Sequence, residues 1–217
     1  AMHKHNVKLG WTGGINRRSV SELVISFAIA LLRQVPASHK EVLLGEWRQH
    51  VGGQLSGRTV GIIGCGNVGK DLVRMLQPFE CSILVNDIKN YDRFYKKYNL
   101  KKVSKDELLS QSDVVTLHTP LDDSTINMLT SERLSLMKSD AILINVARGG
   151  LLDERALKHM LINGELGGAA LDVFSTEPPQ DTELLTLSNF IATPHIGGSA
   201  IEAIMAMGRS AIDGLEQ

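Results

Sequence analysis

The feature that most constrains the fold is a glycine-rich turn between an apolar stretch and a helical stretch. Residues 58–63 (RTVGII) are apolar and rich in β-branched side chains, and Gly64, Gly66 and Gly69 follow in the spacing G-x-G-x-x-G. In such a turn the first glycine permits the sharp reversal, the second lets the backbone approach a pyrophosphate, and the third lets the helix pack closely on the strand. The pattern therefore predicts a strand–turn–helix unit whose helix N-terminus binds phosphates through free N–H groups and the helix dipole.

An acidic residue at the end of the next predicted strand sharpens this prediction. Asp87 ends the stretch 82–87 and lies 18 residues after Gly69, where a carboxylate can accept hydrogen bonds from both hydroxyls of a ribose. A carboxylate also repels a 2′-phosphate, so the sequence favours NAD over NADP, although the neighbouring Lys89 weakens that preference. The alternative is a purely structural glycine turn beside a surface aspartate.

Strand patterns and helix patterns alternate along the rest of the chain. Asp153 is a suitable N-cap for one of these helices, and Gly164 suits the chain reversal after it. We therefore predict an α/β fold with a doubly wound parallel (Rossmann) sheet, a single domain with helices on both faces. The further strands are predicted at 82–87, 113–118, 141–146, 168–174 and 189–193, and helices at 104–110, 131–138 and 153–163.

A long apolar helix is predicted before this sheet. Residues 18–34 carry helix signals: Ser19 or Ser21 can cap the N-terminus, and Pro36 stops the helix. Apolar residues nearly surround this helix, so we expect it to be buried on most sides. The last segment, 199–217, is also helical in period.

Composition excludes several classes of protein. Two cysteines among 217 residues exclude a disulfide framework and suit a reducing cytosol, so a cytoplasmic protein is predicted. A formal net charge of −1 argues against nucleic-acid binding by bulk electrostatics. The longest apolar run, 23–32, is too short to cross a membrane, and no secretory signal is visible. His3 and His5 have no third ligand nearby, so no metal site is predicted.

Three titratable residues each lie just past the end of a predicted strand: Arg148, Glu177 and His195. Because the loops after the carboxyl ends of parallel strands form the ligand crevice, these side chains can converge beside a cofactor. A histidine can donate a proton to a ketone near neutral pH, and a nearby carboxylate favours the imidazolium. An arginine holds a substrate carboxylate with two parallel hydrogen bonds. The three together predict hydride transfer to or from a small acid.

Taken singly, these residues also have simpler interpretations. Arg148 can be structural, Glu177 a solvated turn acid and His195 a hydrogen-bonded turn histidine, so the constellation carries the prediction. His118 lies at another strand end, but we expect no second proton-transfer role for it. Cys65 is expected to fill a position in the glycine turn rather than to act in redox chemistry.

Together these motifs resemble the NAD-binding domain of the D-isomer-specific 2-hydroxyacid dehydrogenases, from about residue 15 to the C-terminus. General appearance favours the phosphoglycerate dehydrogenase and hydroxypyruvate reductase branches, and Glu177 stands where the formate-oxidising branch carries an amide. The segments that carry the resemblance are the cofactor fingerprint at 64–69 with Asp87, SVSELV at 19–24, INVARGG at 144–150, ALDVF at 170–174 followed by Glu177-Pro178, and PHIGG at 194–198.

The resemblance implies a role for each matching residue. Arg148 would bind the substrate carboxylate and carbonyl, His195 would be the acid/base, Glu177 its partner, and Asp172 would contact the nicotinamide side of the cofactor. The cofactor would be NAD and the substrate a 2-hydroxy or 2-oxo acid. The complete set of expected cofactor contacts is Gly64, Gly66, Asn67, Val68, Gly69, Asp87, Thr119, Pro120, Val146, Ala147, Arg148, Asp172, His195, Gly197 and Gly198.

The resemblance also implies a domain organisation. Family members begin with a substrate domain; residues 1–14 resemble only its last strand and hinge, 15–198 the NAD-binding domain, and 199–217 the helix that returns to the substrate domain. We therefore expect an excised cofactor domain or a natural truncation. Such a chain would bind NADH but turn over poorly, because closure of a cleft fixes geometry and excludes water.

The remaining expectations concern partners and competing functions. The family usually dimerises through this domain, which implies a homodimer through residues 18–52, including Trp47. A non-catalytic NAD(H)-sensing module of the corepressor type is the main alternative, but a sensor needs none of Arg148, Glu177 and His195. A relative of homocysteine-adduct hydrolases would leave the segments around Arg148 and His195 unexplained.

Overall fold

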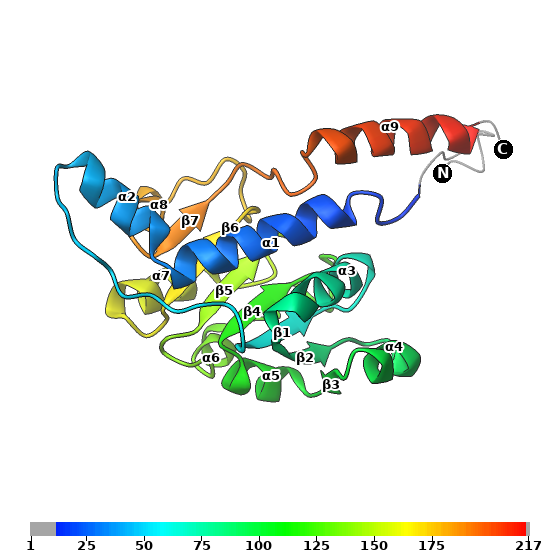
Figure 1. Cartoon of the computed structure of the whole chain (residues 1–217), viewed down its shortest axis with the longest axis horizontal. Helices are drawn as coiled ribbons and strands as arrows, with labels where there is room; N and C mark the ends of the chain where they lie inside the picture. Colours follow the sequence, from blue (N-terminus) through cyan, green and yellow to red (C-terminus); the bar gives the residue numbers. More distant parts are fainter. Residues whose placement is uncertain (1–11, 216–217) are drawn as a thin grey trace.

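The computed structural model describes residues 12–215 of the chain, and within them one parallel sheet organises the fold (Figure 1). Its strand order is β3-β2-β1-β4-β5-β6-β7, and every neighbouring pair is parallel. The predicted doubly wound parallel sheet is confirmed. The strands are β1 (Thr59–Ile63), β2 (Ser82–Asn86), β3 (Lys101–Lys102), β4 (Val114–Leu117), β5 (Ile142–Asn145), β6 (Gly168–Leu171) and β7 (Phe190–Ala192).

Helices cover both faces of the sheet, as predicted. One hydrophobic core lies between the sheet and α1 (Arg17–Leu32), α3 (Asn67–Leu76) and α4 (Asp92–Lys97). The second lies on the opposite face, under α5 (Lys105–Gln111), α6 (Ser131–Leu134), α7 (Glu154–Asn163) and α8 (Thr182–Thr186).

The central strands show why their sequences are continuously apolar. In β5, Ile142 and Ile144 point into the core under α1 and α3, whereas Leu143 points into the opposite core. In β1, Ile62 and Ile63 divide between the two cores in the same way. A strand buried on both faces needs apolar side chains at every position, because successive side chains alternate between faces.

The N-terminal helix differs from its prediction at both ends. Ser19 and Ser21 do not cap α1, because both lie inside it and donate to Gly197 O (2.6 Å) and Val68 O (3.4 Å). Pro36 does not stop this helix, because α1 already ends at Leu32. It lies instead in the first turn of a second helix, α2 (Val35–Leu43), where a missing N–H costs nothing.

Elsewhere the predicted ends hold where a cap fixes them. Asp153 caps α7 by accepting a hydrogen bond from Ala156 N at 2.9 Å, and Gly164 ends the helix in the left-handed conformation. Two other elements are shorter than predicted: the predicted strand 168–174 ends at Leu171, and the predicted helix 131–138 ends at Leu134. The short α4 and β3 lie in a charged stretch for which no element was predicted.

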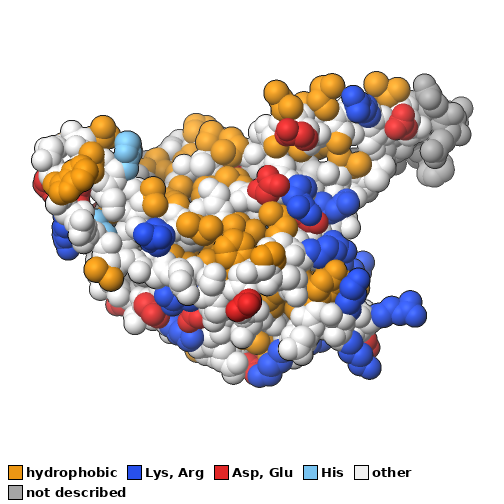
Figure 2. Space-filling view, in the orientation of Figure 1, with side chains coloured by type: hydrophobic (Ala, Val, Ile, Leu, Met, Phe, Trp, Pro, Cys, Tyr) orange, Lys and Arg blue, Asp and Glu red, His pale blue; other side chains and the backbone are white. Residues whose placement is uncertain are grey.

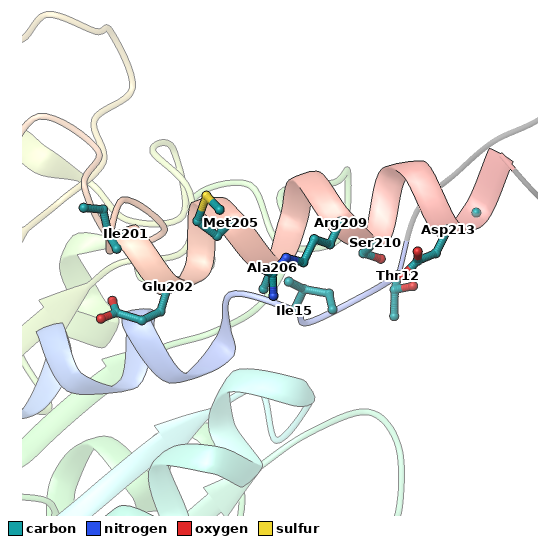
Figure 3. Close-up of a pocket in the computed structure, with 10 residues that line it drawn as sticks. Thr12, Ile15, Ile201, Glu202, Met205, Ala206, Arg209, Ser210 and Asp213 are labelled. Atoms are coloured by element: carbon teal, nitrogen blue, oxygen red, sulfur yellow. The ribbon is translucent and has the colours of Figure 1, made fainter.

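The C-terminal helix α9 (Ile201–Leu215) confirms the helical period of its segment and extends away from the sheet beside the start of the described chain (Figure 1). A groove of about 820 Å³ separates it from the segment 12–15 (Figure 3). Of the proposed substrate-domain remnant, residues 1–11, including His3 and His5, lie outside the described residues. Its last residues form part of a turn that leads into α1.

Apolar side chains are also exposed on α2 and in the segment that follows it. Val42, Leu43, Leu44 and Trp47 are between 50% and 84% exposed, and Figure 2 shows hydrophobic side chains gathered at the α2 end of the molecule.

In the described part of the chain no single helix has the length and hydropathy to cross a bilayer. The bent pair α1 and α2 passes that test only when the two are taken together, on length and composition alone.

Candidate functional site

A crevice opens where the strand order reverses, between the carboxyl ends of β1 and β4. Its volume is about 310 Å³. In open α/β sheets this is the position at which ligands bind, because the chain leaves the two central strands in opposite directions. Seven of the lining residues were predicted to contact the cofactor: Asn67, Val68, Thr119, Pro120, Val146, Ala147 and Arg148. Four were not: Gly14, Asn16, Val20 and His118.

The three glycines of the turn beside this crevice each meet a different environment. Gly64 has φ +97°, and a side chain there would lie 2.6 Å from His118 O. A Cβ on Gly69 would overlap the carbonyl oxygen of Gly64, so this glycine allows α3 to lie directly on the turn. Gly66 has open space within 4 Å. The turn therefore leaves open space beside the bare backbone of Gly66, as a phosphate group requires.

The start of α3 has the donors that an anion needs. Gly66 is its N-cap and, among the described residues, no side chain caps this end, so the N–H groups of the first turn face the crevice uncapped. The Asp87 carboxylate lies at the edge of the same turn. It accepts hydrogen bonds from Cys65 N (2.6 Å) and Lys89 N (2.7 Å), which fixes its orientation. The residues present therefore fit a dinucleotide.

Cys65 is fully buried inside the turn, and burial raises the pKa of its thiol to about 11. The thiol is thus neutral and a poor nucleophile near neutral pH. It fills a position in the turn, which agrees with its small size and its place between two glycines.

His118, at the end of β4, lines the crevice, although no cofactor role was predicted for it. Burial lowers the pKa of His118 to about 3, so its ring is neutral at physiological pH. Its Nε2 lies 3.0 Å from Thr116 Oγ1. Gly14 and Asn16 were also missed, because they reach the crevice from a turn about fifty residues upstream of the glycine pattern.

Arg148 projects from the loop after β5 and is solvent-exposed. The buried side chain of Asn145, which is 1% exposed, bonds to the backbone of this loop. The Asn145 amide donates to Arg148 O at 2.8 Å and accepts from Ala147 N at 3.0 Å. The N–H group and the carbonyl oxygen of the Asn145 amide therefore both fix the backbone of the loop that carries Arg148. Asn145 was not among the predicted site residues.

Glu177 and His195 meet beside the arginine loop. His195 Nδ1 lies 3.3 Å from Glu177 Oε2, and Phe174 N donates to Glu177 Oε1 at 3.2 Å. The Phe174 amide first, and then His195 and Arg148, hold the pKa of the Glu177 carboxyl below its usual range. The carboxylate is therefore ionised at neutral pH and can accept a hydrogen bond from the His195 ring.

The loop that carries His195 is organised by Asp172. This carboxylate is 1% exposed and accepts from Thr193 Oγ1 (2.5 Å), Ile196 N (2.7 Å) and Gly197 N (2.7 Å). Asp172 O also accepts from His195 N at 2.9 Å, which supports the left-handed backbone of His195 at φ +57°. A cavity of about 390 Å³ borders Asp172, Glu177 and His195.

The described residues contain no group of three His, Cys, Asp or Glu side chains placed to hold a metal ion. The arrangement can instead bind a dinucleotide at one end, hold an anion with Arg148 and transfer a proton at His195.

The sequence profile of the NAD-binding domain of the D-isomer specific 2-hydroxyacid dehydrogenases matches residues 25–197. The chain belongs to this family. It is 39% identical to D-3-phosphoglycerate dehydrogenase of Methanocaldococcus jannaschii over 88% of this chain and 37% of that protein. It is 35% identical to glyoxylate/hydroxypyruvate reductase B of Serratia proteamaculans over 99% of this chain and 68% of that protein.

Solved structures give the same result for the fold. The crystal structure of D-lactate dehydrogenase with NAD⁺ from Lactobacillus jensenii superimposes with a TM-score of 0.88 at 26% identity. The match covers 99% of this chain and 69% of that one. The chain is thus an NAD-binding domain of the family, and it spans between 37% and 68% of the length of the two curated relatives named above.

Proposed function

We propose that this chain is the cofactor-binding part of an NAD-dependent oxidoreductase that transfers a hydride between NAD(H) and a D-2-hydroxy or 2-oxo acid. The observation that carries the proposal is the contact between Glu177 and His195, at 3.3 Å, in loops that neighbour the arginine loop of a nucleotide crevice. A module that only senses NAD(H) has no need of such a pair, and the relatives named above are a dehydrogenase and a reductase, not corepressors.

The cofactor would lie along the crevice with its pyrophosphate at the start of α3. Gly66, Asn67 and Val68 would hold the phosphates through backbone N–H groups, and Asp87 would accept from the ribose hydroxyls. The loop residues Thr119, Pro120, Val146 and Ala147 would line the remainder, towards Gly197 and Gly198. When bound, NAD supplies the hydride acceptor, and NADH the donor.

The protein would contribute two things to the reaction: the positive charge of Arg148 and a proton from His195. The exposed Arg148 guanidinium would pair with the substrate carboxylate through two parallel hydrogen bonds and polarise the adjacent carbonyl. With Nδ1 directed at Glu177, His195 keeps Nε2 free to give a proton to the developing alkoxide, or to accept one in the reverse direction. Asp172 would contact the nicotinamide side while it holds the histidine loop.

The relatives favour a small polar 2-oxo acid as substrate. Hydroxypyruvate, glyoxylate and the phosphoglycerate-derived oxo acid are the compounds to test first, because proteins named for their chemistry match this chain at 35% to 39% identity. In keeping with its two unpaired cysteines, we place the protein in the cytoplasm, with no nucleic-acid or membrane partner.

The exposed apolar residues of α2 and the segment after it suit a second copy of the chain. Trp47 is 84% exposed, and Leu43 and Leu44 are each 72% exposed, which is unusual for a soluble monomer. We propose a homodimer through residues 18–52. Light scattering at micromolar concentration should give twice the chain mass, and Trp47→Ala should lower it, whereas Ile162→Ala on α7 should not. A monomeric parent chain contradicts the dimer.

Calorimetric titration of the chain with NADH and NADPH tests the cofactor half of the proposal. Micromolar NADH binding with much weaker NADPH binding is expected, and Asp87→Ala should reduce the difference between them. NADH oxidation with each of the three acids then tests the catalytic half. Absence of NADH binding in a folded chain overturns the proposal.

A further inference from the structure

The loop that carries Arg148 lies against the peptide group between Phe174 and Ser175, in the loop that carries Glu177. A Cβ built on Gly149 would overlap the carbonyl oxygen and carbon of Phe174 and would lie 2.5 Å from Ser175 N. Gly149 is the residue directly after Arg148. The arginine loop therefore rests on that peptide with no side chain in between.

The same peptide is held through its N–H group. Ser175 N donates to Glu154 Oε1, in the first turn of α7, at 2.7 Å. One residue earlier, Phe174 N donates to Glu177 Oε1 at 3.2 Å. The position of the 174–175 peptide thus determines where the neighbouring Phe174 N–H group meets the Glu177 carboxylate. The Gly149 contact determines how close the Arg148 loop lies to the same peptide.

We propose that Gly149 and Glu154 are positioning residues, which fix the 174–175 peptide and thereby hold Arg148 and Glu177 at a set separation. The inference rests on the proposed function, which gives those two side chains their roles. Gly149 acts by having no side chain, and Glu154 acts as a hydrogen-bond acceptor. An acceptor needs an oxygen but not a charge, so glutamine should replace Glu154 and alanine should not.

The test measures the titration of the Glu177 carboxyl by carbon-13 NMR in the chain without cofactor, with the Glu177 signal assigned from Glu177→Gln. In Glu154→Ala the pKa of Glu177 should rise towards its ordinary value, because the Phe174 amide is no longer held against the carboxylate. Glu154→Gln should titrate like the parent chain. If Glu154→Ala also titrates like the parent, or if Glu154→Gln shifts as far as Glu154→Ala, the proposal is wrong.

Gly149→Ala provides the second arm, and Gly208→Ala is its matched control. Gly208 lies in α9 with open space around its Cα, so an added methyl group meets nothing within 4 Å. Gly149→Ala should raise the pKa of Glu177, and Gly208→Ala should leave it unchanged. If Gly149→Ala does not fold, the Glu154 pair still decides the matter.

NADH affinity, measured by calorimetry on the same samples, separates this inference from the function on which it rests. If the parent chain does not bind NADH, the proposed function is wrong, whatever the titrations show. Unchanged NADH binding in Glu154→Ala, together with a shifted Glu177 titration, is the result expected for a positioning residue outside the cofactor crevice.

Discussion

The two halves of the sheet present their functional groups in different ways. Around β1 and α3 the groups are backbone atoms, made accessible by Gly64, Gly66 and Gly69. Beyond β5 they are side chains on loops, and those of Glu177 and His195 are 44% and 49% exposed. A site built from backbone fails when a side chain is added, whereas a site built from side chains fails when one is removed. The same fold therefore has two kinds of sensitivity to mutation.

Removal of the proposed proton donor, His195, tests the half of the sheet that uses side chains. His195→Ala should lower 2-oxo-acid-dependent NADH oxidation by about 10²- to 10⁴-fold, the usual contribution of a general acid. The free energy of unfolding should change little, because the ring is half exposed. Turnover assays and denaturant titrations measure the two quantities. A variant that keeps most of its turnover would remove His195 from the mechanism.

On the backbone half, two glycines of one turn should behave differently. Gly66→Ala should weaken NADH binding at least about tenfold with little loss of stability, because a methyl group there meets the ligand and not the protein. Gly69→Ala should also cost about 1–3 kcal/mol of unfolding free energy, since its Cβ overlaps the Gly64 carbonyl. Calorimetry and chemical denaturation distinguish these effects. Equal stability losses would refute the assignment of separate roles.

Asp172 combines features of both halves. It lies in the side-chain half but is buried and bonded to the backbone of the 193–197 loop. Asp172→Asn places an amide N–H where an acceptor is needed, at a cost of about 2 kcal/mol, typical of a hydrogen bond to a charged group. Chemical denaturation measures this loss. If stability stays at the parent value, the loop is held by other contacts.

A further prediction concerns the pH dependence of stability. His118 has a pKa of about 3 in the folded chain against an ordinary value of 6.5, so the unfolded chain binds more protons between these values. Stability contributed by the neutral ring is therefore present above about pH 6.5 and is lost as the pH falls towards 3. His118→Gln should flatten this part of the stability profile, as followed by denaturation at several pH values. An unchanged profile would show that His118 remains accessible to protons.

Several elements were predicted from strong signals in the sequence. The β1–turn–α3 unit and the Asp153 cap depend on neighbouring residues, and the parallel sheet follows from the alternation of strand and helix patterns along the chain. Pro36 was misinterpreted because proline both ends helices and begins them, and the local pattern does not distinguish the two. The short α4 and β3 have too little apolar periodicity to be recognised; tertiary contacts stabilise them.

The functional residues of the site could be predicted from the sequence, but the contacts that hold them in position could not. Arg148, Glu177 and His195 could be named because each follows a strand, and topology brings such loops together. The contacts that hold them join Gly149 to Phe174 and Glu154 to Ser175, across 21 to 25 residues of chain, and no sequence period marks them. Asn145 was missed because its amide acts on backbone atoms within the next turn.

The contact between Gly149 and the 174–175 peptide also limits how the chain can vary. Two loops that touch backbone to backbone cannot change length independently, because an insertion in either one separates the two surfaces. For protein engineering, the loops after β5 and β6 are one module that must be exchanged as a pair.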